Sequence, residues 1–295
     1  MSRVVFVLTP QVHLLDLAGP AQVFSTADGY DLSYVSEKSP VPTWQGVALH
    51  ASVEWPALTP DDLVLVPGWR EGFGAFATAT LDRIRSHHER GGTVASVCAG
   101  ADALGRAGLL DGRRCTTHHD LQDDLARDYP RATVVRDVLY VGDDRVVTSA
   151  GIASGIDLAL HLVAQRHGPA TAARVAREMV VYARRNGDEP QASAMLRHRA
   201  HLSDVVHRVQ DTIDAGFASP LPLGGLASGA GVSERTLTRL FTAATGQTPL
   251  RYQQVLRVER AEYLIGHGAT VESAARAVGF TDARMLRRLR ARATA

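Results

Sequence analysis

The sequence predicts a two-domain chain, in which an α/β domain precedes an all-α domain with two helix-turn-helix units. Apolar strand-like segments alternate with helix-like segments up to about residue 182, the alternation that builds a parallel sheet covered by helices. A polar stretch containing Gly187 and Pro190 interrupts this pattern. Beyond it the strand patterns stop, and a helix, glycine-containing turn and capped helix occur twice. A length of 295 residues also favours two domains.

The first domain is expected over residues 1–183. Its first strand, Arg3–Thr9, is a continuous apolar run that ends at Pro10, as in a strand buried on both faces. The elements expected next are helix Leu14–Thr26, strands Leu32–Ser36 and Asp62–Val66, helix Phe73–Arg90, strand Thr93–Val97, a helix to Ala107, helix His119–Tyr129, a hairpin of Val138–Val141 and Arg145–Thr148, and helices Ile152–Arg166 and Ala170–Tyr182. This order predicts a flavodoxin-like α/β fold, whose ligands lie beyond the C-terminal strand ends.

The polar stretch is predicted to be a linker over residues 184–200, and it separates opposite charges. Residues 1–195 hold 18 Lys and Arg against 23 Asp and Glu, a net charge of −5, whereas residues 196–295 hold 14 against 8, a net charge of +6. A basic last third suggests contact with a polyanion. No apolar run of about 18 residues and no signal peptide is recognised, and there are only two cysteines. These features predict a cytoplasmic chain without a membrane span.

The last part, residues 201–295, repeats one pattern. Helix Leu223–Ala230 is followed by a turn at Gly231, and Ser233 can cap a second helix, Glu234–Ala244. The second unit consists of helix Val271–Val278, the turn Gly279-Phe280 and a helix from Asp282 to about Arg292, capped by Thr281. Recurrence makes this signal much stronger than a single helix-turn-helix pattern.

Between the two units, Thr248 can cap a helix that begins at Pro249 and runs to Ile265. Seventeen residues at 1.5 Å each give about 26 Å. With the flanking helices, this rod could hold two recognition helices in successive major grooves, roughly 34 Å apart.

Residues spread over about 70 positions carry a family resemblance in this part of the chain. They are Leu226-Ala227, Gly231-Val232-Ser233, Arg235-Thr236-Leu237, Arg239-Leu240-Phe241, Gly246, Thr248-Pro249, Arg257, Ala261 and Ala277-Val278-Gly279-Phe280. They resemble the AraC/XylS-type DNA-binding domain. The resemblance implies a transcriptional regulator that binds double-stranded promoter DNA, forms a homodimer and contacts RNA polymerase if it is an activator.

Exposed positions on the two expected recognition helices are candidate DNA contacts, because Arg reads guanine edges or clamps phosphates. The candidates are Ser233, Glu234, Arg235, Thr238, Arg239, Asp282, Arg284, Arg287 and Arg288. Members of the family usually continue into a Phe-Gly, Pro and Tyr-Arg stretch, whereas this sequence has an Arg/Ala tail to Ala295. We therefore expect the first unit to read more of the base sequence and the second to contact mostly phosphates.

In the first domain, Cys98 lies where strand Thr93–Val97 is expected to meet a helix. The small residues Ala99 and Gly100 allow the sharp turn that lifts a nucleophile out of a sheet. The helix N-terminus is expected to lower the thiol pKa and favour the thiolate. A lone cysteine is also commonly buried and inert, so both interpretations stay open. No chemical role is expected for Cys115.

Five segments of the first domain carry a second resemblance. They are Asp16–Phe24, Pro67-Gly68, Ser96–Ala101, Ala107–His118 and Thr148–Leu160. They resemble the ThiJ/PfpI-type branch of the class I glutamine-amidotransferase-like fold, over about residues 3–182. Members include isonitrile hydratase, glyoxalase-like and protease-like enzymes, and sensor domains of AraC-type regulators. The order of domains is similar to that of the last group.

The resemblance implies that Cys98 stands at the nucleophile position, with Asp16 and His118 near it. Trp69, after the Pro67-Gly68 turn, and Ser149, at a strand end, are expected to line the same pocket. Three departures weaken a catalytic interpretation. Ala99 stands where protease-like members have His and isonitrile-hydratase-like members have Thr, so no base or hydroxyl group is adjacent to Cys98. His118 is a possible substitute base, but the sequence does not give its distance from Cys98. Fusion to a DNA-binding domain also removes the need for turnover. The expected ligand-binding residues are Asp16, Trp69, Cys98, Ala99, His118 and Ser149.

The sequence thus predicts a ligand-responsive transcriptional regulator that is not an enzyme and needs no cofactor or metal. Its small-molecule effector is not identified by any motif. Two alternatives stay open: a cysteine-dependent hydratase or hydrolase, and a redox sensor in which oxidation of Cys98 changes DNA affinity.

Overall fold

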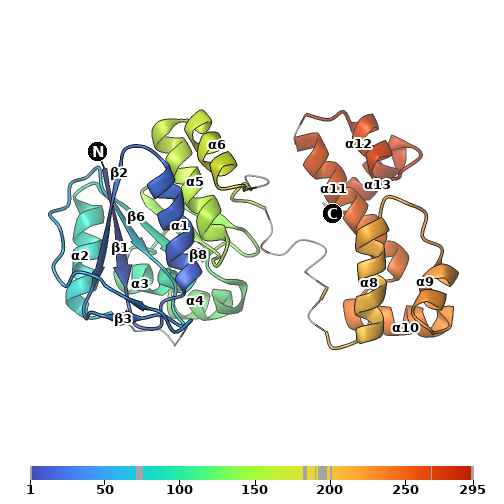
Figure 1. Cartoon of the computed structure of the whole chain (residues 1–295), viewed down its shortest axis with the longest axis horizontal. Coiled ribbons are helices and arrows are strands. Elements are labelled where there is room, and N and C mark those ends of the chain that lie inside the picture. Colours follow the sequence, from blue (N-terminus) through green and yellow to red (C-terminus); the bar gives the residue numbers. More distant parts are fainter. Residues whose placement is uncertain are drawn as a thin grey trace. The chain divides into compact units, whose positions relative to one another are not determined.

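The computed structural model describes residues 2–70, 76–181, 185–189, 191, 198–199, 201–266 and 268–293. The chain divides into two compact units, Met1–Gln191 and Ala192–Ala295, called here the first and second domains (Figure 1). Most of the predicted linker 184–200 lies outside the described residues, so its bounds stay a prediction. No helix in the described ranges is long and apolar enough to cross a membrane.

The first domain is built on a six-stranded sheet. Across the sheet the strands are β2 (Tyr30–Ser36), β1 (Ser2–Leu8), β5 (Leu63–Val66), β6 (Thr93–Val97), β10 (Val146–Ser149) and β9 (Tyr140–Asp143). The first five are parallel, and β9 pairs antiparallel with β10 at the edge. Counted among themselves, the parallel strands run 2-1-3-4-5, the flavodoxin order. The predicted α/β fold and its hairpin are confirmed.

Helices cover both faces of this sheet (Figure 1). One layer holds α1 (Leu14–Thr26), α5 (Ser154–His167) and α6 (Pro169–Glu178), and the other holds α2 (Thr78–Glu89) and α3 (Gly100–Arg106). The remaining elements are β3 (Val41–Pro42) with β4 (Ala48–Leu49), β7 (Arg114–Cys115) with β8 (Thr133–Val134), the 3-10 turn η1 (His119–Leu121) and α4 (Gln122–Asp128).

Two cores result from the alternation of side chains along each strand. On β1, Val4, Phe6 and Leu8 pack in the core shared with α1, α5 and α6. Val5 and Val7 face the opposite way and pack in the core shared with α2 and α3. Because both faces are covered, the strand has no solvent-facing side, which explains its continuous apolar sequence.

Three predicted helices differ at their ends. The helix expected from Phe73 begins at Thr78, and residues 71–75 lie outside the described residues. Its start depends on a distant residue, because the Glu37 carboxylate accepts hydrogen bonds from the backbone N–H of Ala77 (2.8 Å) and the hydroxyl of Thr80 (2.6 Å). The segment expected as one helix over His119–Tyr129 is η1 followed by α4.

The helix expected to reach Tyr182 ends at Glu178. Val180 takes a left-handed conformation with φ +56°, and the N–H of Val181 returns to the carbonyl of Ala176. This is the usual way to end a helix by satisfying its last carbonyl groups.

The second domain is helical throughout its described residues, as predicted (Figure 1). Its helices are α8 (Asp204–Gly216), α9 (Leu223–Gly229), α10 (Glu234–Thr245), α11 (Pro249–Gly266), α12 (Val271–Ala277) and α13 (Ala283–Ala293). The pairs α9–α10 and α12–α13 form two helix-turn-helix units, each with its own apolar core.

Side-chain caps start the helices of these units. The hydroxyl of Ser233 accepts from the N–H of Thr236 at 3.2 Å, and that of Thr248 accepts from the N–H of Arg251 at 3.3 Å, as predicted. The predicted cap at Thr281 is wrong. Helix α13 begins one residue later, so the carboxylate of Asp282 caps it by accepting from the N–H of Arg284 at 2.8 Å.

Helix α11 joins the two units through Arg257. Its guanidinium group donates three hydrogen bonds of 2.6–3.1 Å to the backbone carbonyls of Phe217, Ser219 and Gly279. The first two carbonyls belong to the connection before α9, and the third belongs to the turn between α12 and α13. Gly279 has φ +84°, and a Cβ there would overlap the carbonyl oxygen of Ala218. The family residues Arg257 and Gly279 therefore hold one unit against the other.

Arg257→Ala should destabilise the second domain by about 2 kcal/mol or more, because three carbonyl groups lose a charged donor. The three tryptophans all lie in the first domain, so their fluorescence follows that domain alone. During urea denaturation the part of the helical circular dichroism signal that comes from the second domain should be lost at lower urea, while the fluorescence transition stays in place. Arg251→Ala on the same helix is the control and should change neither curve. Equal stability of both variants would contradict the role given to Arg257.

Candidate ligand pocket and nucleic-acid interface

Cys98 occupies the predicted sharp turn between β6 and α3. Its φ is +55° and its N–H donates to the carbonyl of Ser149 at 2.9 Å. Gly68, after β5, and Gly151, after β10, both approach the Cβ of Cys98 so closely that a side chain on either would overlap it. The C-terminal ends of three neighbouring strands thus converge on this one residue.

The Cys98 thiol is buried, with 6% of the residue exposed. Burial raises the pKa of this thiol well above its usual value, and the adjacent carboxyl group of Asp16 raises it further. The prediction that the helix N-terminus lowers the pKa is therefore wrong. Desolvation and a neighbouring negative charge both disfavour the thiolate, and they outweigh the dipole of a helix only seven residues long.

Asp16 lies in the first turn of α1 and is fully buried. Its carboxyl group points toward Gly68 and Cys98, since a Cβ on Gly68 would overlap Oδ2 of Asp16. Burial raises the pKa of Asp16 to about 7, against the opposing effects of the Gly68 N–H and the Cys98 thiol. Neither carboxyl oxygen has a hydrogen-bond partner of good geometry among the described residues. Near neutral pH the group is thus partly protonated.

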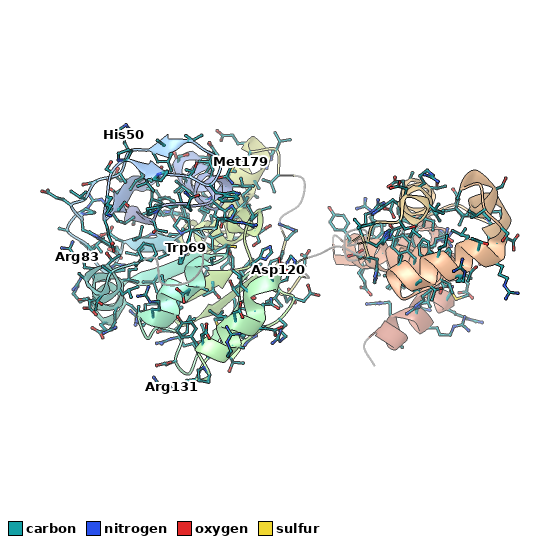
Figure 2. The ribbon with its side chains drawn as sticks, turned by 90° about the horizontal axis from the view of Figure 1, so that it is seen from below. His50, Trp69, Arg83, Asp120, Arg131 and Met179 are labelled. Carbon is teal, nitrogen blue, oxygen red and sulfur yellow. The ribbon has the colours of Figure 1, made fainter. Side chains whose placement is uncertain are left out.

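A cavity of about 290 Å³ opens beside Cys98. Of the predicted ligand-binding residues, Trp69, Cys98, Ala99 and His118 line it. Asp16 and Ser149 do not line it: both are fully buried, and the Ser149 hydroxyl donates to the carbonyl of Ser96 at 3.4 Å. Figure 2 labels two wall residues, of which Trp69 is buried and Asp120 is exposed.

Sequence reasoning missed six further wall residues: His13, Arg70, Asp120, Leu121, Asp124 and Ile152. Most of them follow the C-terminal ends of strands or lie in the segment after β7, where ligands of such sheets are expected. Their place after strand ends was the signal that could have found them. They add one imidazole, one guanidinium group and two carboxylates to the wall formed by Trp69, Cys98, Ala99 and His118.

The surroundings of the two wall histidines, His13 and His118, lower the pKa of both and so disfavour their protonated forms. Burial lowers the pKa of His118, and His119 and His13 lower it further, although Asp120 opposes them. Burial and the charge of Arg70 lower the pKa of His13. The guanidinium group of Arg70 itself lies 5.1 Å from the centre of the Trp44 ring, a cation–π distance. Arg70 is therefore the permanent positive charge of the pocket wall.

Hydrogen bonds connect the pocket wall to the segment that leaves the first domain. The hydroxyl of Thr117 donates to the carbonyl of Cys98 at 2.7 Å. The side-chain amide of Gln191 donates to the carbonyls of Thr117 (3.0 Å) and Val138 (3.1 Å). The side chain of Arg185 also pairs with the buried Asp157 at 2.5 Å. Residues 185 and 191 are thus anchored on the first domain.

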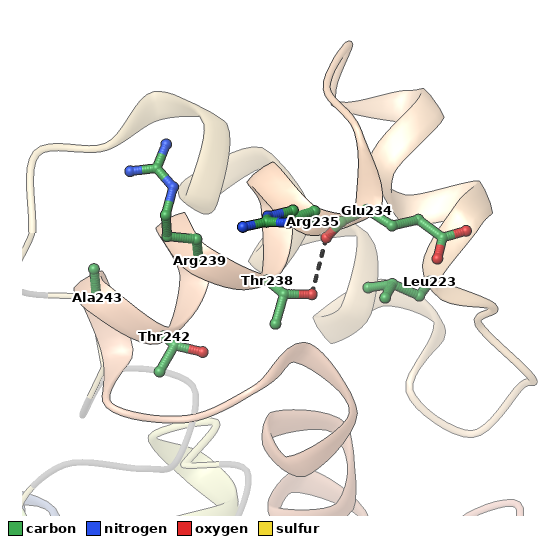
Figure 3. Close-up of a pocket in the computed structure, with 7 residues that line it drawn as sticks. All are labelled: Leu223, Glu234, Arg235, Thr238, Arg239, Thr242 and Ala243. Carbon is green, nitrogen blue, oxygen red and sulfur yellow. Dashed lines mark hydrogen bonds between the residues drawn. The ribbon is translucent and has the colours of Figure 1, made fainter.

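In the second domain, α10 presents a polar face beside a shallow hollow (Figure 3). Leu237 and Phe241 anchor its inner face in the core, while Ser233, Glu234, Arg235 and Arg239 are exposed and Thr238 is half-buried. The Thr238 hydroxyl donates to the carbonyl of Glu234 at 2.9 Å. Arg235 and Arg239 are one turn apart, hence on one face. Neither forms an ion pair with any residue in the described ranges.

The candidate residues of α13 are also exposed but have local partners. Arg287 pairs with Glu272 of α12 at 2.5 Å, and Arg284 lies 3.9 Å from the carboxylate of Asp282. Arg288 donates to the sulfur of Met285 at 3.0 Å. Such exposed ion pairs contribute only about 0–1 kcal/mol, so a phosphate could displace them.

Comparison with known proteins gives matches for both domains. Residues 2–165 match the DJ-1/PfpI family and residues 226–295 match a helix-turn-helix domain. The HTH-type transcriptional regulator CdhR of Pseudomonas aeruginosa is 29% identical over 230 residues, which is 78% of this chain and 68% of CdhR. The isonitrile hydratase of Pseudomonas putida is 37% identical over 173 residues, which is 57% of this chain and 73% of the hydratase.

Among solved structures, an AraC family transcriptional regulator from Pseudomonas putida is similar with a TM-score of 0.53 and 23% identity. The match covers 61% of this chain and 100% of that one. This similarity supports the α/β fold described above for the first domain. The chain itself spans about two thirds of the length of CdhR.

Cys98 should react with iodoacetamide at least about tenfold more slowly than free cysteine at pH 8, because only the thiolate is alkylated. Asp16→Asn removes the neighbouring negative charge, lowers the thiol pKa and should speed the reaction. Since Asp16 ionises near pH 7, the ratio of variant to wild-type rate should be close to one well below that pH and increase above it. Mass spectrometry of the Cys98 peptide measures both rates.

Cys115 provides the internal control, because it is fully buried and burial alone raises its pKa. Its rate should not respond to Asp16→Asn. Alkylation of wild-type Cys98 at the rate of free cysteine would show that its thiol is not held protonated.

Proposed function

The chain belongs to the DJ-1/PfpI family and carries an AraC-type helix-turn-helix domain, and from this premise we propose that it is a DNA-binding transcriptional regulator whose first domain binds a small ligand. The matched helix-turn-helix domain and the similarity to CdhR, over a stretch longer than either domain, support DNA-binding regulation. The observation that carries the proposal is the exposed face of α10. There Arg235 and Arg239 lack ion-pair partners among the described residues, on a helix that is capped and fixed by a core.

The first unit, through Ser233, Glu234, Arg235, Thr238 and Arg239, is proposed to read bases in a major groove. The second, through Asp282, Arg284, Arg287 and Arg288, is proposed to contact mostly phosphates. The ion-pair pattern supports this division, because Arg287 already lies beside a carboxylate whereas Arg235 and Arg239 do not. The 18 residues of α11 give a rod of about 27 Å, which suits two units on one face of DNA.

The experiment that tests this function is genome-wide occupancy followed by binding to a recovered fragment. Arg235→Ala with Arg239→Ala should remove preference for that fragment over a scrambled one, with each Arg–guanine pair contributing about 1–3 kcal/mol of discrimination. Arg287→Ala with Arg288→Ala should weaken binding to all sequences alike. It should also reduce the slope of affinity against salt by about one per lost phosphate contact.

Arg208→Ala, at an exposed position of α8, is the matched control and should alter neither property. A loss of base preference caused by the α13 variants, but not by the α10 variants, would reverse the assignment. No reproducible genomic site under any growth condition would rule out the regulator.

The pocket beside Cys98 is proposed to bind its ligand without turnover. A protonated, buried thiol is a weak nucleophile and a slow target for oxidants, and Ala99 brings neither a base nor a hydroxyl group. These features speak against both the enzyme and the redox-sensor alternatives. Trp69, Ala99 and His118 would contact the ligand, and Asp16 and Ser149 would support the turn from behind. This role calls for no cofactor, and a protein that regulates transcription from promoter DNA would act in the cytoplasm, where a bacterial chromosome lies.

A homodimer is proposed because two linked DNA contacts bind more tightly than one, and RNA polymerase is a further partner if the protein activates transcription. Ligand binding can alter DNA binding only if it favours one arrangement of the chain over another. The hydrogen bonds from Cys98 through Thr117 to Gln191 offer a route. A ligand that moves the wall residues Cys98 or His118 would shift Thr117, which lies behind them, and with it the anchor of the connecting segment.

Thr117→Val keeps the shape of the side chain but removes its hydrogen bond to Cys98. If the route couples the pocket to the connecting segment, amide hydrogen exchange over residues 185–191 should become faster, as it should in Gln191→Ala. The effects of the two substitutions should be less than additive. Thr171→Val is the matched control, because its hydroxyl also donates to one carbonyl, that of His167 at 2.9 Å. Unchanged exchange in Thr117→Val would exclude this route.

A further inference from the structure

Three consecutive residues, His118, His119 and Asp120, place metal-binding atoms next to one another at the pocket wall. One donor atom from each lies within 4.8 Å of the others. From this geometry we propose that the three side chains bind a divalent transition-metal ion of the Zn²⁺ type. His118 and Asp120 also line the cavity beside Cys98, so the ion would lie at the edge of the pocket.

The distances between the donor atoms fit such an ion. Nδ1 of His118 lies 3.6 Å from Oδ2 of Asp120, and Nε2 of His119 lies 3.3 Å from Oδ1. Ligands about 2.0–2.1 Å from a tetrahedral zinc ion are roughly 3.3–3.4 Å from each other. The two pairs already stand near this separation. Nδ1 of His118 also accepts a hydrogen bond from the backbone N–H of Asp120 at 3.3 Å, and a metal ion bound to Nδ1 would replace that bond. The two imidazole rings lie side by side, with centroids 4.1 Å apart.

The charges around the cluster also favour a cation. Among the described residues, the ion pairs of Asp120 are with His118 and His119, the two other members of the cluster. A divalent cation bound at the cluster would compensate the charge of this carboxylate. Asp124 on the same wall adds a second carboxylate, although it lies 2.7 Å from Arg127.

The donor set selects the class of ion. Two imidazoles and one carboxylate suit zinc and neighbouring transition metals, whereas magnesium and calcium prefer sites made of oxygen alone. Three protein ligands leave at least one coordination position open. Because His118 and Asp120 line the cavity, that position is available to water or to an oxygen or nitrogen donor of a molecule in the pocket. This inference does not depend on the DNA-binding function.

Metal binding is measured on the full chain without DNA. Zn²⁺ titration by calorimetry gives the stoichiometry and affinity, and Co²⁺ titration followed by visible absorption reports the coordination. We expect one ion per chain. His119→Ala and Asp120→Ala should each weaken binding at least about tenfold. Both side chains are mostly exposed, at 64% and 74%, so the variants should fold, which circular dichroism checks.

Two control variants make the result specific. His50→Ala removes an exposed histidine elsewhere in the first domain. His207→Ala removes one ring of another close histidine pair, His201 and His207, whose centroids are 4.2 Å apart. Both should leave the site unchanged. The proposal is overturned if wild type shows no saturable binding, if His119→Ala and Asp120→Ala bind as wild type does, or if His207→Ala abolishes the site. None of these outcomes would contradict the proposal that α10 binds DNA, which the experiments above test separately.

Discussion

The close approach of three strand ends around Cys98 is the constraint on which the first domain depends. Backbone from the segments after β5 and β10 comes so near to the Cβ of Cys98 that only glycine fits at positions 68 and 151. Cys98 itself must take a left-handed conformation to continue into α3. The ends of β5, β6 and β10, the start of α3 and the wall of the cavity all lie at this residue. The turn therefore determines where the cavity lies and which side chains can reach it.

The same packing decides the chemistry of the turn. A nucleophile needs an accessible thiolate, but the segments that form the turn also exclude water from it. Asp16 is carried beneath the turn by α1 and adds negative charge where a thiolate would form. The position that the family resemblance assigns to a nucleophile thus becomes the buried side of the cavity. The polar groups that the cavity offers come instead from residues after the strand ends, such as His13, Arg70 and Asp120.

In the second domain, the hydrogen bonds of Arg257 are the contact on which the packing of the two helix-turn-helix units depends. Three backbone carbonyls from two separate segments share one guanidinium group, which holds the two helix-turn-helix units together. The surface arginines are then divided by their surroundings. Glu272 on α12 faces Arg287, whereas Arg235 and Arg239 on α10 meet no carboxylate among the described residues. Identical arginine side chains therefore differ in whether a carboxylate of the protein already compensates their charge.

The sequence by itself determined the two domains, the alternation of strands and helices, both helix-turn-helix units, the caps at Ser233 and Thr248, and the turn at Cys98. These features depend on local backbone preferences and on the period of apolar residues, which a single stretch of chain contains. Only the tertiary structure decided where α2 begins, because Glu37 caps it from another element. It also decided the high pKa of Cys98, the displacement of Asp16 and Ser149 from the pocket wall, and the pairing of Arg287. Desolvation and ion pairing depend on groups that are distant in sequence, so they become defined only when the chain packs.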